Sequence, residues 1–472
     1  MPALERFAIQ RNQLRLLCSQ GMSSGGSWCD LYFENTSIWS LVLRDSIVSS
    51  GGYHRDYGCG IRVLNGEKTG YAYTESTDME SLSKAAKAAG SIADSCSSGN
   101  FPQKSVKIEG RPDYYPMIQD LRQTQSGDFV PLLQELDKKI RQADSRVCNV
   151  IAMLSYSLSE ILMYNSLDEL SEDLRPLCSL ALTVVFRQGK DIQTKNCSKS
   201  LRMGAEFYNE SLVEELCSQV TDGVDALFEA SRPQGGVMNV VMGAGASGIL
   251  LHEAMGHAFE ADFNRKGQSI FADKLGKRIC KAGLNIVDDA TLPFYRGSTN
   301  YDDEGVPGQK TYMVRDGILT SYLHDRISAA YYGVASTGNG RRESFRYYPI
   351  PRMRSTYMEN GQDGTLEDLI HLAANGIYVN EFSNGEVKIG EGDFTFYVKS
   401  GYMIENGRLT RPIKDVNIIG NGPQALADIE AVASDLKIDE GKWTCGKGQN
   451  MPVSCGIPSV LIKNLTVGGG SL

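Results

Sequence analysis

Residues 237–262 have the sequence VMNVVMGAGASGILLHEAMGHAFEAD, and this stretch decides how the second half of the chain is organised. The run 237–242, which is apolar except for Asn239, is typical of a buried strand, and the residues after the glycine-rich loop are typical of a helix. That helix contains His252, Glu253 and His257, so two of the five histidines in 472 residues lie beside one carboxylate. We therefore expect the chemistry of the protein in this strand–loop–helix unit.

The glycine spacing permits an interpretation as a nucleotide-binding loop. Gly243, Gly245 and Gly248 match the pattern G-x-G-x-x-G between a strand and a helix, where backbone amides can cradle a pyrophosphate. That fingerprint also needs an acidic residue at the end of a second strand, roughly 20 residues further on. Glu260 and Asp262 lie instead in the same predicted helix. A nucleotide-dependent oxidoreductase is therefore disfavoured, and a close approach of strand and helix explains the glycines equally well.

The histidine pair favours a metal site. Imidazole binds zinc well, and a neighbouring carboxylate such as Glu253 can accept a proton from metal-bound water. His252 and His257 are five residues apart, which places them about 140° out of phase on a regular α-helix. Both rings can reach one ion only if the helix contains a π-type bulge or ends near Gly256. The spacing therefore predicts a metal site together with a local distortion of the helix.

A metal held by three protein ligands, with one position open for water, needs a third donor. Cys445, in the segment TCGKGQ, is the leading candidate because a thiolate binds zinc strongly and the flanking glycines allow a close approach. Cys455 is its rival, and His324 and His371 are further candidates from their spacing. The residues alone leave this choice open.

The pattern outside this unit predicts an α+β protein. The length of 472 residues allows two or three domains. Proline and glycine in the segment SRPQGG indicate a domain boundary. We expect a mixed α/β region at 1–235, with a sub-boundary near 100–115, followed by a β-rich domain at 236–472 that carries the metal-binding helix.

Short-range periodicity places the expected elements. Alternating apolar and polar residues predict strands, and apolar residues three and four apart predict helices. The expected strands are 29–34, 37–44, 57–64, 70–74, 147–165 and 179–187, and the expected helices are 78–93, 128–145 and 213–230. A hairpin is expected at Asn65-Gly66, and Asp316-Gly317, Asn384-Gly385 and Asn406-Gly407 predict turns between strands of the second domain.

Composition excludes several classes of protein. The 48 basic and 57 acidic residues give a net charge of −9, which argues against non-specific nucleic-acid binding. The 11 cysteines include no Cys-x-x-Cys pair and do not suggest a secreted disulfide scaffold. No signal peptide is visible, and no uncharged apolar run reaches the ~18 residues typical of a membrane span. We expect a cytoplasmic protein with reduced thiols, without direct contact to membrane or nucleic acid.

The chain resembles the TldD/PmbA family, whose members are called modulators of DNA gyrase and are understood as metallopeptidases. The resemblance spans almost the whole chain and preserves the order of many short motifs. These are CDLYFE at 29–34, GIRVL at 60–64, TGYA at 69–72, HEAMGHAFEAD at 252–262, DDEGVP at 302–307, STGNGRR at 336–342, PRMR at 351–354, GDFTF at 392–396, IGNGP at 419–423, CGKGQ at 445–449 and VGG at 467–469.

The resemblance implies a function and a set of site residues. Only the TldD branch of the family carries H-E-x-x-x-H, which is intact here, so the chain looks like the catalytic branch. Membership implies one zinc ion per chain, held by His252, His257 and Cys445, with Glu253 as the general base. The implied reaction is hydrolysis of unfolded or short peptides by a homodimer or by a heterodimer with a PmbA-type partner. The alternative is a non-catalytic peptide-binding or regulatory subunit of such a complex.

Three further motifs have two interpretations each. Arg341 and Arg342 could hold a substrate carboxylate, or could be solvated arginines in a glycine-rich turn. The acidic residues at 302–304 could form a second carboxylate cluster, but a turn before the following glycine and proline is favoured. The tyrosine pairs at 331–332 and 347–348 are expected to pack at the edge of the core rather than to line a peptide groove.

Overall fold

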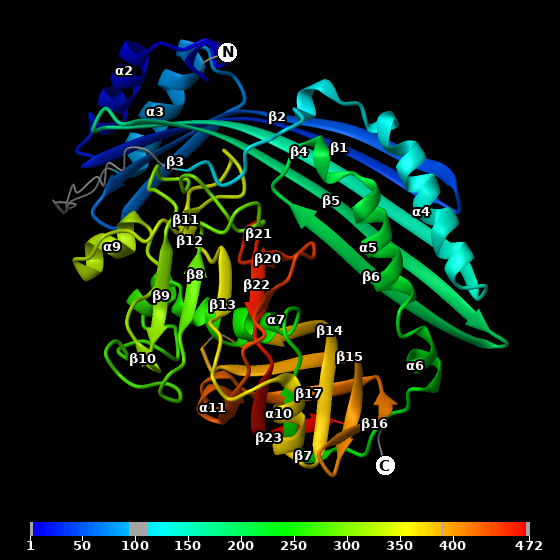
Figure 1. Ribbon diagram of the computed structural model, residues 1–472. Helices are drawn as coiled ribbons and strands as arrows, with labels where there is room; N and C mark the ends of the chain where they lie inside the picture. The colour runs from blue at the N-terminus through cyan, green and yellow to red at the C-terminus, as the bar shows by residue number, and fades with distance from the viewer. Residues whose placement is uncertain (1–2, 94–111, 389, 469–472) are drawn as a thin grey trace.

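The computed structural model describes residues 3–93, 112–388 and 390–468, and these residues form an α+β fold, as the sequence predicts (Figure 1). The expected sub-boundary near 100–115 falls largely on residues 94–111, which lie outside the described residues. Among the helices of the described residues, none combines the length and the hydropathy that a membrane crossing requires.

The N-terminal half is built on a sheet of six antiparallel strands in the order β3-β2-β1-β4-β5-β6. These strands are β1 (Trp28–Arg44), β2 (Ile47–Asn65), β3 (Lys68–Thr74), β4 (Val147–Asn165), β5 (Leu170–Gln188) and β6 (Asp191–Leu201). The expected hairpin joins β2 to β3. The two short strands expected at 29–34 and 37–44 are one strand of 17 residues, because the period-two alternation continues through the polar residues between them.

Helices cover one face of this sheet and bury its apolar positions. The helices of this half are α1 (Ala3–Arg6), α2 (Arg11–Met22), α3 (Met79–Ala93), α4 (Val130–Ala143), α5 (Glu210–Thr221) and α6 (Val224–Glu229). Leu31 and Phe33 of β1 pack with α2 and α3, whereas Leu41 and Leu43 pack with α4 and α5. The single helix expected at 213–230 is two helices, because Gly223 takes a left-handed φ of 69° between α5 and α6.

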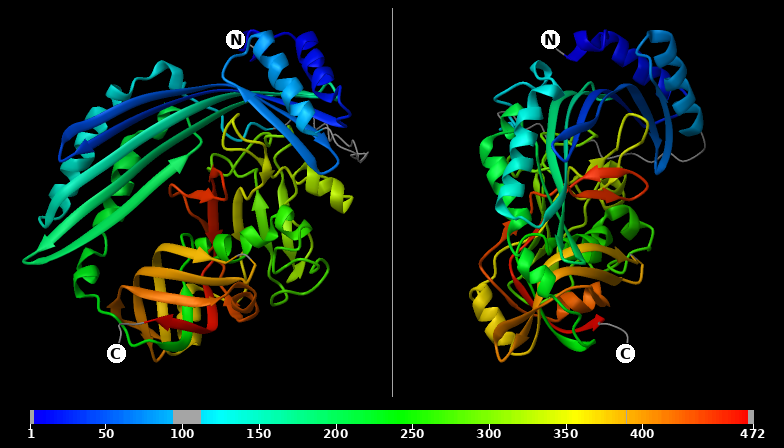
Figure 2. Two further views of the ribbon diagram at one scale, coloured as in Figure 1. Left: turned by 180° about the vertical axis from the view of Figure 1, so that it is seen from behind. Right: turned by 90° about the vertical axis from the view of Figure 1, so that its right-hand side faces the viewer.

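The opposite face of the sheet contacts the C-terminal half in more than one place. Tyr32, Ile161 and Met163 project from that face and pack against Phe345 of the second half. The strands then continue past this contact and bow over the C-terminal half, as both views in Figure 2 show. The two halves are also joined along β6, where the amide of Ser200 donates to the carbonyl of Glu440 and Lys199 pairs with the Glu440 carboxylate.

The C-terminal half contains a closed β-barrel. Five strands pair in the order β14-β7-β23-β17-β15, and β14 also pairs with β15, which closes the ring. The barrel strands are β7 (Gly236–Met242), β14 (Gly376–Val387), β15 (Asp393–Glu405), β17 (Val416–Asn421) and β23 (Val460–Gly468), with β16 (Arg408–Ile413) and β18 (Ile429–Val432) at its side. β7 begins at Gly236, although the division into 1–235 and 236–472 stays a prediction.

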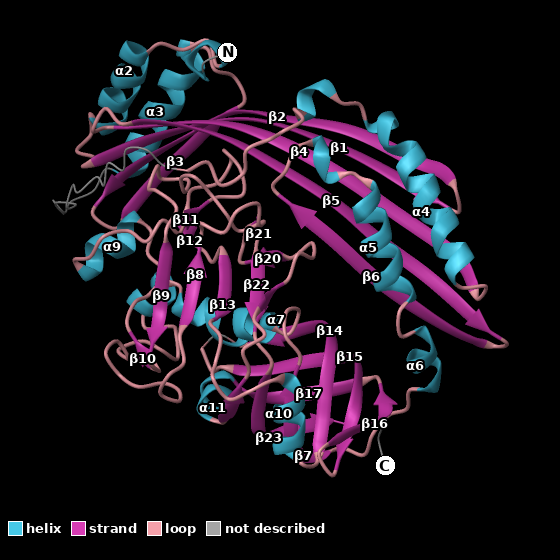
Figure 3. Cartoon of the chain, viewed as in Figure 1, coloured by secondary structure: helices cyan, strands magenta, loops and turns pink. Residues whose placement is uncertain are grey.

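A second, mixed sheet packs beside the barrel, and the described residues of this half are rich in strands, as predicted (Figure 3). Its strands, in the order β10-β9-β8-β13-β22-β19, are β8 (Ile286–Asp289), β9 (Lys310–Arg315), β10 (Ile318–Leu319), β13 (Ser355–Met358), β19 (Lys437–Ile438) and β22 (Ser454–Ile457). Two small hairpins are β11 (Gly340–Arg341) with β12 (Ile350–Pro351), and β20 (Thr444–Gly446) with β21 (Asn450–Pro452). The short helices are α7 (Gly248–Leu251), α8 (Ala261–Arg265), α9 (Arg326–Tyr332), α10 (Leu366–Ala373) and α11 (Gly422–Ala427).

The predicted turns of this half are confirmed at two of three places. Asp316-Gly317 lies between β9 and β10, and Asn406-Gly407 lies between β15 and β16. The turn expected at Asn384-Gly385 is wrong, because these residues lie inside β14, where irregular register with β15 absorbs them. A β-bulge uses the same residue types as a tight turn, so the local sequence could not distinguish the two.

Candidate metal centre

The glycines of the 243–248 loop serve backbone geometry. Gly245 has a φ of 88°, a conformation that other residues rarely adopt. A Cβ atom on Gly248 would lie 2.5 Å from the backbone nitrogen of Gly456 in β22. The loop therefore reverses the chain after β7 and lets α7 pack directly on β22, in agreement with the close approach that the sequence suggested.

The helix changes its geometry at the histidine pair. Its regular turn, α7, is followed by a π-helical turn over His252–Gly256 and a 3-10 turn over His257–Phe259. A π turn accommodates one extra residue, so positions five apart come to one side of the helix. The distortion predicted from the spacing of the two histidines is thus confirmed. Gly256 has ordinary helical angles, and its lack of a side chain makes room for Met353, whose Sδ would lie 2.0 Å from an added Cβ.

This turn brings His252 and His257 together with Cys445 of β20. The ligand-type atoms of the three side chains all lie within 4.8 Å of one another, and all three residues are buried. Nε2 of His257 lies 3.1 Å from the Cys445 Sγ, and the two imidazole rings have centroids 5.3 Å apart. Within the described part of the chain, this is the group of histidine, cysteine and carboxylate side chains whose spacing suits a metal ion.

The donor set fits a zinc ion. His252 is 1% exposed, yet neither of its ring nitrogens has a hydrogen-bond partner, which is costly unless another group binds there. Burial opposes ionisation of Cys445, but the adjacent His252 and His257 outweigh it and lower the pKa of this thiol to about 4. Imidazole and thiolate are both zinc ligands, and three protein ligands with a fourth position open to water are typical of catalytic zinc sites.

Glu253 lies at the edge of this cluster. Its Oε2 is 4.0 Å from Nε2 of His257, and its side chain is 25% exposed, whereas the three cluster side chains are nearly inaccessible. A carboxylate in this place can reach a water molecule that approaches the cluster from solvent. The structure therefore places the predicted general base beside the predicted ligands.

Sequence reasoning did not assign a role to Glu260 in a metal site. Its Oε2 lies 3.0 Å from Nδ1 of His257 and 3.0 Å from Nζ of Lys447. Burial opposes the ionised carboxylate, but Lys447 and His257 outweigh it and lower the pKa of Glu260 to about 2. Carboxylates commonly orient the second nitrogen of a ligating histidine. An acidic residue three positions after a candidate ligand is the signal that could have identified it.

The other candidate ligands lie outside the cluster. Cys455 is buried in β22, and burial, followed by Asp439 and Glu253, raises the pKa of its thiol well above the usual value. His324 is buried beside Tyr332, and burial lowers its pKa to about 4. His371 lies on α10 and is exposed. None of these three side chains belongs to the metal-type group of the described residues.

The arginine pair of the STGNGRR motif is buried in the structure. Arg341 and Arg342 are each 4% exposed, so the expectation of solvated arginines is wrong. Arg341 donates to the carbonyls of Met353 and Pro452, whereas Arg342 donates to Asp30 of the N-terminal half. Both guanidinium groups are buried and donate hydrogen bonds to the protein itself, which disfavours a role in holding a substrate carboxylate.

The acidic motif at 302–304 forms the favoured turn, since the carbonyl of Asp302 accepts a hydrogen bond from the amide three residues on. All three residues are buried, and two of them pair with arginines of the N-terminal half. Asp303 lies 2.5 Å from Arg175, and Glu304 lies 2.7 Å from Arg62. The motif therefore joins the two halves of the molecule.

Three of the four tyrosines at 331–332 and 347–348 are partly exposed, and two of these three pack on another aromatic ring, Tyr331 on Tyr332 and Tyr348 on Tyr71. Tyr331, Tyr347 and Tyr348 are between 40% and 55% exposed, whereas Tyr332 packs on the rings of Tyr322 and His324. Only one member of the two pairs is therefore largely covered.

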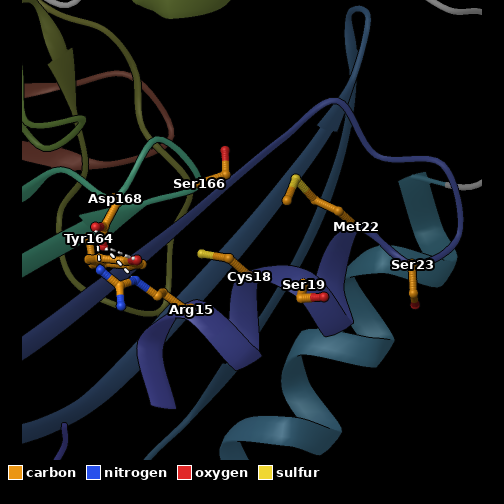
Figure 4. Close-up of a pocket in the computed structure, with 8 residues that line it drawn as sticks. All are labelled: Arg15, Cys18, Ser19, Met22, Ser23, Tyr164, Ser166 and Asp168. Atoms are coloured by element: carbon orange, nitrogen blue, oxygen red, sulfur yellow. Dashed lines mark hydrogen bonds and ion pairs between the residues drawn. The ribbon is translucent and has the colours of Figure 1, made fainter. Parts of the chain in front are cut away.

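A surface hollow lies away from the cluster, between α2 and the turn after β4 (Figure 4). Arg15, Cys18 and Tyr164 are among the residues that line it, and no cluster residue does. The charge of Arg15 is already paired with Asp168. This hollow contributes nothing to the chemistry of the cluster.

Comparisons with known proteins agree with the fold and the cluster. Models of the PmbA/TldA metallopeptidases match the chain in three parts, namely domain 1 at residues 29–93, the central domain at 119–224 and the C-terminal domain at 235–469. Two solved structures have the same fold. A Thermotoga maritima protein described as a candidate modulator of DNA gyrase gives a TM-score of 0.78 at 21% identity, covering 97% of this chain and 99% of its own. TldE from Thermococcus kodakarensis gives a TM-score of 0.74 at 19% identity, and the match covers 97% of this chain and 100% of the TldE chain.

Sequence relatives narrow the assignment. The metalloprotease TldD homologue of Buchnera aphidicola (subspecies Acyrthosiphon pisum) is 37% identical over 97% of this chain and 95% of its own length. The metalloprotease TldD homologue of Haemophilus influenzae is 37% identical over 94% of this chain and 93% of its own length. The zinc metalloprotease TldD homologue of Saccharolobus solfataricus is 33% identical over 62% of this chain and 65% of its own length.

Fold and cluster together define an α+β protein with a buried group of two histidines and one cysteine, and its relatives bear the name metalloprotease. More narrowly, the chain belongs to the PmbA/TldD metallopeptidase family.

Proposed function

We propose that the chain is a zinc-dependent peptidase that hydrolyses unfolded or short peptides. His252, His257 and Cys445 are the proposed zinc ligands, and Glu253 is the proposed general base. The observation that carries this proposal is the buried group of two imidazoles and one thiolate, within 4.8 Å of one another, with a partly exposed carboxylate beside it. The names of the relatives, which include a zinc metalloprotease, support the same chemistry.

Each of the proposed site residues has a separate role in hydrolysis. A zinc ion in this group would lower the pKa of a water molecule and polarise the scissile carbonyl. Glu253 accepts the proton of the attacking water and passes it to the departing amine. Glu260 holds Nδ1 of His257, so that Nε2 of this ring stays directed at the cluster.

The proposed substrate is a peptide in extended form, and the proposed assembly is a dimer. An extended peptide can add to a strand edge by main-chain hydrogen bonds, which suits a strand-rich domain. The similarity to TldE supports pairing with a PmbA-type partner, with a homodimer as the alternative. Size measurement of the purified chain, alone and with such a partner, distinguishes the two assemblies.

Metal analysis and peptide hydrolysis together test the proposal. We expect about one zinc ion per wild-type chain, and Glu253→Ala should retain the metal while kcat falls by about 10²–10⁴-fold, the usual contribution of a general base. His257→Ala should lose both metal and activity. Unchanged metal content in His257→Ala would show that the cluster is not the metal site. Zinc and peptide binding without turnover, in the presence of a PmbA-type partner, would indicate the non-catalytic subunit instead.

One contact also favours a second candidate, a cysteine–histidine hydrolase. Cys445 Sγ lies 3.1 Å from Nε2 of His257, and its pKa is low enough for a thiolate nucleophile. Cys445 is only 2% exposed, which is unfavourable for attack on a polypeptide. A chelator should abolish hydrolysis by the zinc enzyme and leave a cysteine hydrolase active.

A further inference from the structure

Arg352 lies in the PRMR motif at 351–354, to which neither the sequence nor the proposed reaction assigns a role. It is located between β12 and β13 and its side chain is completely buried. Nη2 donates to the carbonyl of Cys445, and Nη1 donates to the carbonyl of Gln449, each at 2.7 Å. One guanidinium group therefore holds the β20–β21 hairpin at both ends of its turn. Arginine suits this task because its planar fork offers two donors in a fixed geometry.

The same guanidinium faces the helix that carries the histidines. Nε of Arg352 is 3.6 Å from Oε1 of Glu260, and both side chains are 0% exposed. Neither of these two atoms has a hydrogen-bond partner. The other carboxylate oxygen of Glu260 binds Nδ1 of His257 at 3.0 Å. Arg352 thus contacts the residue that orients His257 and the backbone that carries Cys445.

The buried negative charge of Glu260 gives a reason for a cation beside it. A histidine that ligates a metal is neutral, so it cannot offset the charge of the buried Glu260. Two cations remain close to this carboxylate, Lys447 at 3.0 Å and Arg352 at 3.6 Å. Lys447 lies in the hairpin turn and also pairs with Asp262 at 2.7 Å. Lys447 joins the two ligand-bearing elements from within the hairpin, whereas Arg352 lies on a separate segment and contacts both of them.

We propose that Arg352 is a positioning residue that holds the Cys445 hairpin and the His257–Glu260 pair at the separation required to bind the metal. This inference rests on the proposed metal site and deepens it. Arg352 does not touch the reacting atoms, and it acts through Glu260 and the Cys445 backbone. Its removal should weaken metal binding even in chains that stay folded.

Arg354 provides a matched control. It lies two residues further on, is 3% exposed, and donates through Nε to the carbonyl of Gly338. Loss of either guanidinium removes a buried, hydrogen-bonded cation from the same segment, but only Arg352 bonds the Cys445 hairpin and faces Glu260. Arg352→Met and Arg354→Met should therefore lower the thermal stability of the metal-free chain by similar amounts, which separates folding from metal binding.

The decisive measurements are zinc affinity by chelator competition and the absorption spectrum of the cobalt-loaded protein. We expect Arg352→Met to weaken zinc binding about 10–100-fold, the usual effect of losing a partner of a ligating residue. We also expect its thiolate-to-cobalt charge-transfer band to weaken or shift. Arg354→Met should match the wild type in both measurements. The zinc affinity of Arg352→Lys should lie between those of Arg352→Met and Arg354→Met. Lysine restores the charge beside Glu260 but not the paired hydrogen bonds to the carbonyls of Cys445 and Gln449.

The outcomes separate this inference from the proposed function. Equal affinities and spectra for Arg352→Met and Arg354→Met would overturn the positioning role and leave the metal site intact. No metal binding by the wild-type chain would overturn both proposals. If Arg352→Met does not fold, Arg352→Lys decides: a wild-type spectrum and affinity refute the inference, and a loosened site supports it.

Discussion

The contrast between Cys445 and Cys455 shows how environment divides two similar residues. Both are buried, both lie on short strands of the C-terminal half and both precede a glycine. Cys445 lies against two imidazoles that favour its thiolate, whereas Cys455 has acidic neighbours, Asp439 and Glu253, which add to the effect of burial. A thiolate is the form that binds metals. Cys445 is therefore suited to bind a metal ion as a thiolate, whereas Cys455 is not.

This contrast predicts unequal effects of removing each thiol. Cys445→Ser should weaken zinc binding by more than about 100-fold, beyond the loss expected for an outer partner of a ligand. Cys455→Ser should keep the wild-type affinity, because its side chain is not part of the cluster. Zinc content after dialysis against a graded chelator series measures both. Equal losses in the two variants would contradict the assignment of Cys445 as the third ligand.

At the scale of elements, the helix that carries His252 and His257 depends on a close contact between backbones. α7 is only four residues long and continues directly into the π turn. Short helices have little stability of their own and depend on tertiary packing. α7 obtains this packing on β22, where Gly248 meets Gly456 without an intervening side chain. The position of the histidines is therefore set by a glycine four residues before His252.

Gly248→Ala should destabilise the protein, although alanine normally stabilises a helix relative to glycine by about 1 kcal/mol. The added Cβ would lie 2.5 Å from backbone of Gly456, which cannot move as a side chain can. We expect a loss of about 1–3 kcal/mol in the free energy of unfolding, as for an overpacked core. Urea titration measures it.

Gly127→Ala is the control for this substitution, because an added Cβ there has nothing within 4 Å. It should be neutral or slightly stabilising. Equal effects of the two substitutions would show that α7 does not depend on close packing against β22.

At the scale of the whole molecule, buried ionic and polar contacts join the two halves. Arg62 of β2 pairs with Asp30 of β1 and with Glu304 of the second half, and all three side chains are nearly inaccessible. The carboxylate of Glu34 accepts a hydrogen bond from the backbone of Phe345 at 2.7 Å. Buried ionisable groups make such a contact sensitive to protonation.

Glu34 predicts how this contact responds to pH. Burial is the main cause that raises its pKa from 4.5 to about 7. The folded state therefore binds this proton more tightly than the unfolded state, and the associated stability is complete below pH 4.5 and lost as pH rises to about 7. In Glu34→Gln this loss should disappear, so the two proteins should differ in the slope of the free energy of unfolding between pH 5 and pH 7. Parallel profiles in urea titrations would contradict the prediction.

The sequence by itself determined the local features of this protein. Period-two alternation located β4 correctly, and the Asn65-Gly66 pair located the hairpin between β2 and β3. The five-residue spacing of His252 and His257 requires a distorted turn if both rings are to reach one ion, and the π turn is that distortion. Local patterns failed at Gly223, whose left-handed φ divides one expected helix, and at Asn384-Gly385, which lies within a strand of irregular register.

Only the tertiary structure decided which distant residues meet. Cys445 is 188 residues from His257, and residues alone left it in competition with Cys455. The roles of Glu260 and Arg352 follow from their buried contacts, and Arg341 and Arg342 are interior residues. The closed barrel likewise follows from the pairing of β14 with β15, β7 and their neighbours. The physical reason is that periodicity records which side of an element is buried, whereas the partner on that side depends on packing and charge balance across the whole fold.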